Sequence, residues 1–193
     1  RSEFVKKIKL MPSRAFRFEH LFLKKFNKKK TNNKIIILLN LDKETCIEII
    51  DKIKKTDFVQ NNNFVYIKEH PLLELRKFYH KPLPKNFKLI SGNFYDIVKN
   101  FKVVIASGSS SSVYESLLSG SKIIFPINDY YDNLNLQMLD VPKSYYKVCN
   151  NVRELDTYIS KFLSQDINYF EHYKNKLKNS INDKRNTNFF EKN

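Results

Sequence analysis

The chain has 193 residues, 41% of them hydrophobic, and carries a formal net charge of +15 at pH 7. This size suits one domain, or one domain with a segment of another, and the apolar content is sufficient for a buried core. No run reaches the roughly 18 apolar residues of a membrane-spanning helix, and no apolar signal-peptide core follows the first residue. Because the sequence begins Arg-Ser-Glu-Phe without Met, we expect a fragment of a longer protein.

The positive charge is spread through a sequence that is rich in Lys, Asn and Ile and poor in Ala, Gly and Arg. Lys is the weaker choice for bidentate phosphate recognition, so general residue bias explains the charge better than a selected nucleic-acid surface. We expect cytoplasmic residence with a peripheral contact to the anionic inner face of the membrane. Cys46 and Cys149 have neither metal-ligand spacing nor a disulfide framework, and we expect buried thiols in a reducing compartment.

Three regions are expected along the chain. Residues 1–33 are basic with interleaved Phe and Leu, typical of a connector or of the remnant of a preceding lobe. Residues 34–165 alternate apolar runs with helical spacing and form the main domain. Residues 166–193 form a C-terminal helix and a polar tail.

Within the main domain the predicted elements alternate between strand and helix. Short apolar runs predict strands at 34–41, 64–67, 87–90, 103–106, 123–125 and 145–149. Helical spacing predicts helices at 43–55, 72–79, 94–101, 113–118 and 152–163, with a polar loop at 56–63. This order predicts an α/β fold with a doubly wound, mostly parallel sheet.

The segment 103–126 is the clearest unit in the sequence. A buried-strand run ends at Ser107-Gly108, four serines stand where a helix begins, and Gly120 ends that helix before the next strand. Small residues and unpaired N–H groups at a helix start attract an anion, so a phosphate is the expected ligand of Ser107, Gly108, Ser109, Ser110, Ser111 and Ser112. Simple capping would need only one of these serines. Neither GxxxxGK[ST] nor GxGxxG is present.

A second polar group, Lys68-Glu69-His70-Pro71, follows another predicted strand. In a parallel sheet both groups reach the same edge, where α/β sheets bind ligands. His70 is expected to donate to a phosphate or a leaving-group oxygen, against the alternative of a structural histidine. Lys68 either faces the same anion or is solvated. Glu115, one turn into the helix, either accepts ribose hydroxyls or complements the helix dipole.

Together, KEHP at 68–71 and SGSSSSVYESLLSGSKIIFP at 107–126 resemble the nucleotide-binding half of GT-B glycosyltransferases, a Rossmann-like domain. The similarity is strongest to bacterial surface-carbohydrate and sialyltransferase-like families, in which a His-Pro element and a serine turn hold the phosphate of a CMP-sugar. It covers roughly residues 34–163. The resemblance implies phosphate binding by His70, Pro71 and the serine turn, contact of Glu115 with ribose or base, and a base pocket lined by Ser91-Gly92-Asn93.

The resemblance also implies a reaction and its partners. We expect transfer of a sugar from a nucleotide donor to a glycan or lipid-linked acceptor in capsule or lipopolysaccharide synthesis, with no cofactor and no obligatory metal. Ile123 stands where many retaining enzymes carry a second glutamate, which favours inversion. The catalytic base of inverting enzymes comes from the amino-terminal half, which this chain is expected to lack. The alternatives are a CDP-glycerol-type phosphotransferase, a sugar-nucleotide epimerase, or a non-catalytic basic module for nucleic acid or anionic lipid.

Overall fold

The computed structural model describes residues 33–107, 112–126 and 143–165. All of them belong to one compact unit, residues 26–170. The connector predicted at 1–33, Asn33 apart, and the C-terminal helix and tail predicted at 166–193 lie outside the described residues. The predicted domain boundaries therefore stay predictions.

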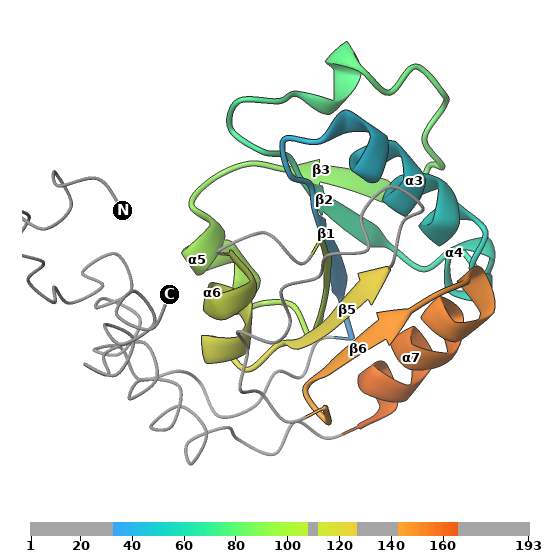
Figure 1. Ribbon diagram of the computed structural model, residues 1–193, viewed down its shortest axis with the longest axis vertical. Helices are drawn as coiled ribbons and strands as arrows, with labels where there is room; N and C mark the ends of the chain where they lie inside the picture. The colour runs from blue at the N-terminus through green and yellow to red at the C-terminus, as the bar shows by residue number, and fades with distance from the viewer. Residues whose placement is uncertain (1–32, 108–111, 127–142, 166–193) are drawn as a thin grey trace, which may run out of the picture. The chain divides into compact units, whose positions relative to one another are not determined.

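A six-stranded, fully parallel sheet forms the centre of this unit (Figure 1). The strands lie in the order β3-β2-β1-β4-β5-β6, and every neighbouring pair is parallel. This is the order of doubly wound dinucleotide-binding sheets, so the predicted fold class is confirmed. The strands are β1 (Ile35–Leu38), β2 (Val65–Lys68), β3 (Phe87–Ile90), β4 (Val103–Ala106), β5 (Lys122–Pro126) and β6 (Tyr146–Cys149).

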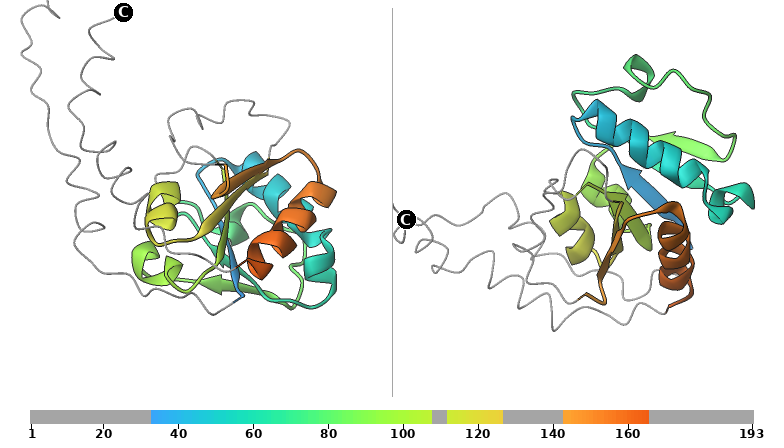
Figure 2. Two further views of the ribbon diagram at one scale, coloured as in Figure 1. Left: turned by 90° about the horizontal axis from the view of Figure 1, so that it is seen from below. Right: turned by 45° about the vertical axis from the view of Figure 1, so that its right-hand side comes forward.

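Helices cover both faces of the sheet, as Figures 1 and 2 show. One face carries α3 (Lys43–Lys54), α4 (Asp57–Gln60) and α7 (Val152–Ser164), which pack against one another. The other face carries α5 (Phe94–Val98) and α6 (Ser112–Leu118). Short polar side chains start four of these helices: Asp42, Thr56, Asn93 and Asn151 each accept a hydrogen bond from a backbone N–H of the first turn.

The two central strands are buried along their whole length. All four residues of β1 and all four of β4 are buried, because helices cover both faces of a parallel sheet. Side chains of alternate residues point to opposite faces, so Ile35 and Ile37 join the core under α3 and α7. This burial explains why both strands appear in the sequence as continuous apolar runs rather than as alternating patterns.

Two helical predictions differ from the structure. The polar loop expected at 56–63 contains the one-turn helix α4, which starts because the Thr56 side chain accepts from the Val59 N–H. The helix expected at 72–79 is only a 3-10 turn, Leu75–Lys77. Its chain stays irregular because Glu69 Oε1 accepts the Leu75 N–H at 2.6 Å, which takes a donor from any longer helix.

Candidate functional site

The carboxyl ends of β1 and β4 mark the point at which the strand order reverses. From β1 the chain proceeds outward to β2 and β3 on one side, and from β4 to β5 and β6 on the other. Loops that leave two neighbouring strands in opposite directions leave a crevice between them, which is where open α/β sheets bind ligands. The register aligns Leu38 with Lys68 and with Ala106. Asn40 and His70 follow two positions past these aligned residues, and Ser107 follows one position past them.

His70 lies just past the end of β2, and its ring is held by the backbone that follows it. The Leu72 N–H donates to His70 Nδ1 at 3.2 Å, and the Leu73 N–H donates to the His70 carbonyl oxygen at 3.0 Å. Because Nδ1 accepts a hydrogen bond, the proton of the neutral ring is assigned to Nε2. The half-buried imidazole therefore presents an N–H donor.

The segment after His70 is fastened to the body of the domain rather than left as a loose loop. Leu75 is 2% exposed and packs into the main core. The Tyr79 hydroxyl donates to Asp51 Oδ1 of α3 at 2.8 Å, and Lys81 pairs with the other oxygen of that carboxylate. Burial, and then the hydrogen bond to Asp51, raise the pKa of Tyr79 far above its ordinary value. These contacts fix the backbone that orients the imidazole.

The other residues of the predicted His-Pro element have different surroundings. Lys68 is half-buried, and its Nζ donates to the Glu69 carbonyl oxygen at 3.3 Å. Pro71 is exposed. The structure therefore places Lys68 at the same edge as His70, with its ammonium turned toward the loop backbone.

The serine turn is described only at its two ends. Ser107 follows β4 and is half-buried, and Ser112 is the first residue of α6. Gly108, Ser109, Ser110 and Ser111 lie outside the described residues. Since β1 alone separates β2 from β4, His70 and Ser107 leave the same edge of the sheet on strands about 10 Å apart, twice the usual strand spacing.

Asn40 stands between these two groups and was not predicted as a site residue. It follows β1, and its Nδ2 donates to Ser107 Oγ at 2.9 Å. In the sequence 67 positions separate the two residues, so only the pairing of β1 with β4 brings them together. Position 40 falls inside the strand predicted at 34–41, whereas β1 ends at Leu38. A polar residue near the end of an apolar run was the one available sequence signal.

The residues expected around the base and ribose lie farther along the edge. Ser91, Gly92 and Asn93 follow β3, an outer strand of the sheet, which β2 and β1 separate from β4. Gly92 has φ +113°, a conformation that favours glycine, and Asn93 Oδ1 accepts the Tyr95 N–H at 2.9 Å. Glu115 is half-buried in α6, and its charge, after burial and Asp96, helps to raise the pKa of Tyr95 on α5. Their roles toward a nucleotide stay predictions.

Asp42 anchors the start of α3 beside Asn40. Burial alone would raise the pKa of this carboxyl, but hydrogen bonds from the Thr45 hydroxyl at 2.6 Å and the Glu44 N–H at 3.2 Å hold the pKa below its ordinary value of 3.8. Asp42→Ala should therefore cost about 1 kcal/mol of unfolding free energy at pH 7, as the loss of a helix cap does.

The cost of Asp42→Ala should also depend on pH. As the pH falls, the unfolded chain protonates Asp42 first, so the stabilisation is complete above about pH 5 and is lost as the pH passes through the folded-state pKa. Urea unfolding at pH 7 and pH 3 should show the gap between wild type and variant narrowing in acid. Asp57→Ala, at an exposed first-turn aspartate of α4, is the control and should change stability by a few tenths of a kcal/mol. An equal gap at both pH values would contradict this account of the cap.

Both cysteines are buried, as the sequence indicated. Burial raises the pKa of Cys46 and of Cys149 to about 12, so neither thiol ionises near neutral pH. Among the described residues, His, Cys, Asp and Glu side chains do not gather in threes as a metal site would require. In the same part of the chain, every helix is too short or too polar to cross a bilayer.

Comparison with known proteins finds similarity in structure alone. No family model and no curated protein matches the chain. Among solved structures, the glycotransferase of kitacinnamycin is similar with a TM-score of 0.52 and 11% identity, over 88% of this chain and 45% of that one. Glycosyltransferase VinC in complex with DTDP is similar with a TM-score of 0.48 and 10% identity, over 79% and 38% of the two chains.

The chain spans less than half the length of these structures. At 11% identity, the first similarity shows a shared fold, the parallel α/β sheet with helices on both faces. The resemblance drawn from the His-Pro and serine motifs is thus supported at the level of the GT-B fold.

Proposed function

We propose that this chain is the nucleotide-sugar-binding half of a GT-B glycosyltransferase. The observation that carries the proposal is the reversal of strand order between β1 and β4, with the loops of His70 and Ser107 leaving the sheet on either side of it. A nucleotide phosphate seated there would lie across the end of β1. The similar glycotransferase structure, which shares the fold, supports the proposal.

The chemistry assigned to the site is stabilisation of the departing nucleotide. When the bond between the anomeric carbon and the phosphate oxygen breaks, negative charge develops on that oxygen. The His70 Nε2–H would donate to the phosphate, and the ammonium of Lys68 would add positive charge at the same edge. Ser107 to Ser112 would supply hydroxyl and backbone donors. Glu115 and the Ser91-Gly92-Asn93 turn would face ribose and base.

The finer identity of the reaction follows from the sequence motifs. The donor is proposed to be CMP-linked, and the acceptor a surface glycan or its lipid-linked precursor. The net charge of +15 supports a peripheral contact with the anionic inner face of the membrane. Product analysis separates sugar transfer from the nearest alternatives, glycerophosphate transfer and sugar-nucleotide epimerisation.

Nucleotide titration tests the proposal. CMP, CDP and UDP are titrated into the 193-residue chain by calorimetry, and at least one should bind at or below millimolar concentration. His70→Ala should weaken binding roughly 10- to 100-fold, because a hydrogen bond to a charged group contributes about 1.5–3 kcal/mol.

His80→Ala is the matched control for that titration. His80 is an exposed histidine of the same irregular segment, close to the contact of Tyr79 with α3. Its replacement should change the nucleotide Kd less than twofold. A folded wild type that binds no nucleotide, or equal effects of the two variants, would overturn the proposal. Salt-dependent binding of polyanions that ignores His70 would support the non-catalytic alternative instead.

A further inference from the structure

Asn40 uses the two ends of its side-chain amide for different purposes. Its Oδ1 accepts the Asp42 N–H at 3.0 Å and lies 3.3 Å from Cys46 Sγ, both at the start of α3. Its Nδ2 donates to Ser107 Oγ at 2.9 Å, across the reversal point of the sheet. The Oδ1 end therefore connects the end of β1 with the start of α3, and the Nδ2 end contacts the first residue after β4.

The backbone settles which way this amide points. The Asp42 N–H can only donate, so the atom facing it must be the oxygen, and the nitrogen must face Ser107. The Ser107 hydroxyl accepts from Asn40, so its own hydrogen must point away from the amide. Within residues 33–107, 112–126 and 143–165 that hydrogen meets no acceptor.

We propose that Asn40 is a positioning residue that holds the Ser107 hydroxyl as a donor toward the phosphate bound at the reversal point. The inference rests on the proposed function and adds to it a residue that touches no substrate. An aspartate at position 40 has nearly the same shape and could still accept the Asp42 N–H. It could not donate to Ser107, and the hydroxyl would turn to donate to the carboxylate instead of to the ligand.

The purely structural alternative makes a different prediction. If Asn40 only connects β1 with α3, the contacts of Oδ1 are sufficient, and Asn40→Asp retains the stronger of them. Its effect on nucleotide affinity would then be independent of Ser107. If Asn40 acts through Ser107, removal of the hydroxyl must abolish the part of its effect that is due to orientation.

A double-mutant cycle with CMP as the probe distinguishes the two. The Kd is measured for the wild type, Asn40→Asp, Ser107→Ala and the double variant. The new negative charge repels phosphate in both backgrounds and cancels in the cycle. We expect each single variant to raise the Kd about 10-fold or more. The factor by which Asn40→Asp raises the Kd should be at least fivefold smaller in the Ser107→Ala background than in the wild type.

Two further variants keep the cycle decisive. Asn151→Asp places the same charge after β6, where Asn151 caps α7 through an oxygen that aspartate also has, and it should change the Kd less than twofold. If Asn40→Asp unfolds at the assay temperature, Asn40→Ala replaces it, because that variant also lacks the Nδ2–H donor. If the effects of the Asn40 and Ser107 substitutions on the Kd are independent while CMP binding still depends on His70, this inference is overturned and the proposed function is not. A wild type that binds no nucleotide removes the proposed function as well.

Discussion

Phe125→Ala should lower the free energy of unfolding by about 3–5 kcal/mol, the largest change expected for any single substitution considered. Phe125 lies in β5, is 0% exposed, and packs edge-on against Tyr146 with ring centroids 6.1 Å apart. Its neighbour Ile124 faces the core under α3 and α7, so Phe125 fills the opposite face of the sheet. Truncation leaves a cavity between β5 and the helices on that face, α5 and α6. The close-packed surroundings fill this cavity only in part.

Urea unfolding followed by circular dichroism measures the effect. Total stabilities of single domains are about 5–15 kcal/mol, so the Phe125→Ala protein should be at the margin of folding at room temperature. Phe64→Ala is the control, since Phe64 is 50% exposed and the Lys88 ammonium lies 3.9 Å from its ring centroid. The control should cost about 1 kcal/mol or less. Similar losses in the two variants would contradict the burial pattern of β5.

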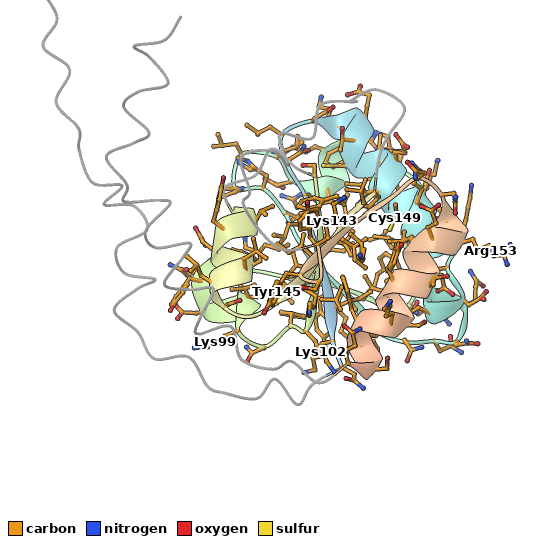
Figure 3. All side chains as sticks on the ribbon, turned by 60° about the horizontal axis from the view of Figure 1, so that its bottom comes forward. Lys99, Lys102, Lys143, Tyr145, Cys149 and Arg153 are labelled. Carbon is orange, nitrogen blue, oxygen red and sulfur yellow. The ribbon has the colours of Figure 1, made fainter. Side chains whose placement is uncertain are left out.

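Lys102→Met should destabilise the domain by about 2–3 kcal/mol, although methionine fills nearly the same volume. Lys102 precedes β4 and is 6% exposed. Its Nζ donates to the Leu163 carbonyl oxygen, near the end of α7, and lies 3.4 Å from Asn33 Oδ1. Figure 3 shows Lys102 beside that end of α7, at the opposite end of the sheet from Cys149. Carbonyl groups of a last helical turn lack partners within the helix, and a cation there also complements the helix dipole.

Lys99→Met is the matched control, three positions earlier in the chain. The Lys99 side chain is 56% exposed and pairs with Asp96 at 3.7 Å, a surface ion pair worth at most about 1 kcal/mol. We expect no more than about 0.5 kcal/mol of destabilisation from it in chemical unfolding. Hydrogen exchange supplies the second readout: Lys102→Met should release the amides of the last turn of α7 before those of β4. If the Lys102→Met protein were as stable as the Lys99→Met protein, the contact of the Lys102 ammonium with the Leu163 carbonyl oxygen would contribute little to stability.

The strands were predictable because each one is marked by its own residues. Helices cover both faces of β1 and β4, and such strands must be apolar throughout, which leaves runs such as Ile35 to Leu39 in the sequence. Short-range signals also mark helix starts, since an Asp or Asn before a helical pattern caps it through bonds within four residues. Gly120, with φ +79°, ends α6 for a similarly local reason.

Local signals failed where a contact from elsewhere in the chain outweighs them. The segment 72–79 has helical spacing, yet Glu69 takes the Leu75 N–H and Tyr79 is held by Asp51, so only a short turn forms. Thr56 starts the one-turn helix α4, although the polar, Asn-rich sequence around it is typical of a loop. The Asp156 side chain of α7 accepts the Phe58 N–H of that turn at 3.0 Å. Long-range partners of this kind leave no periodic trace in the sequence.

By itself the sequence determined the class of fold and the identity of the six strands. It also showed that two of these strands are followed by polar loops, which contain His70 and Ser107. These features depend on burial and capping, which act through residues close together in the chain. Only the tertiary structure decided which strands are neighbours, and therefore that Asn40, which follows β1, meets Ser107, which follows β4, across 67 positions. Strand order is fixed by how the helices pack on the two faces of the sheet, a cooperative property that no single segment encodes.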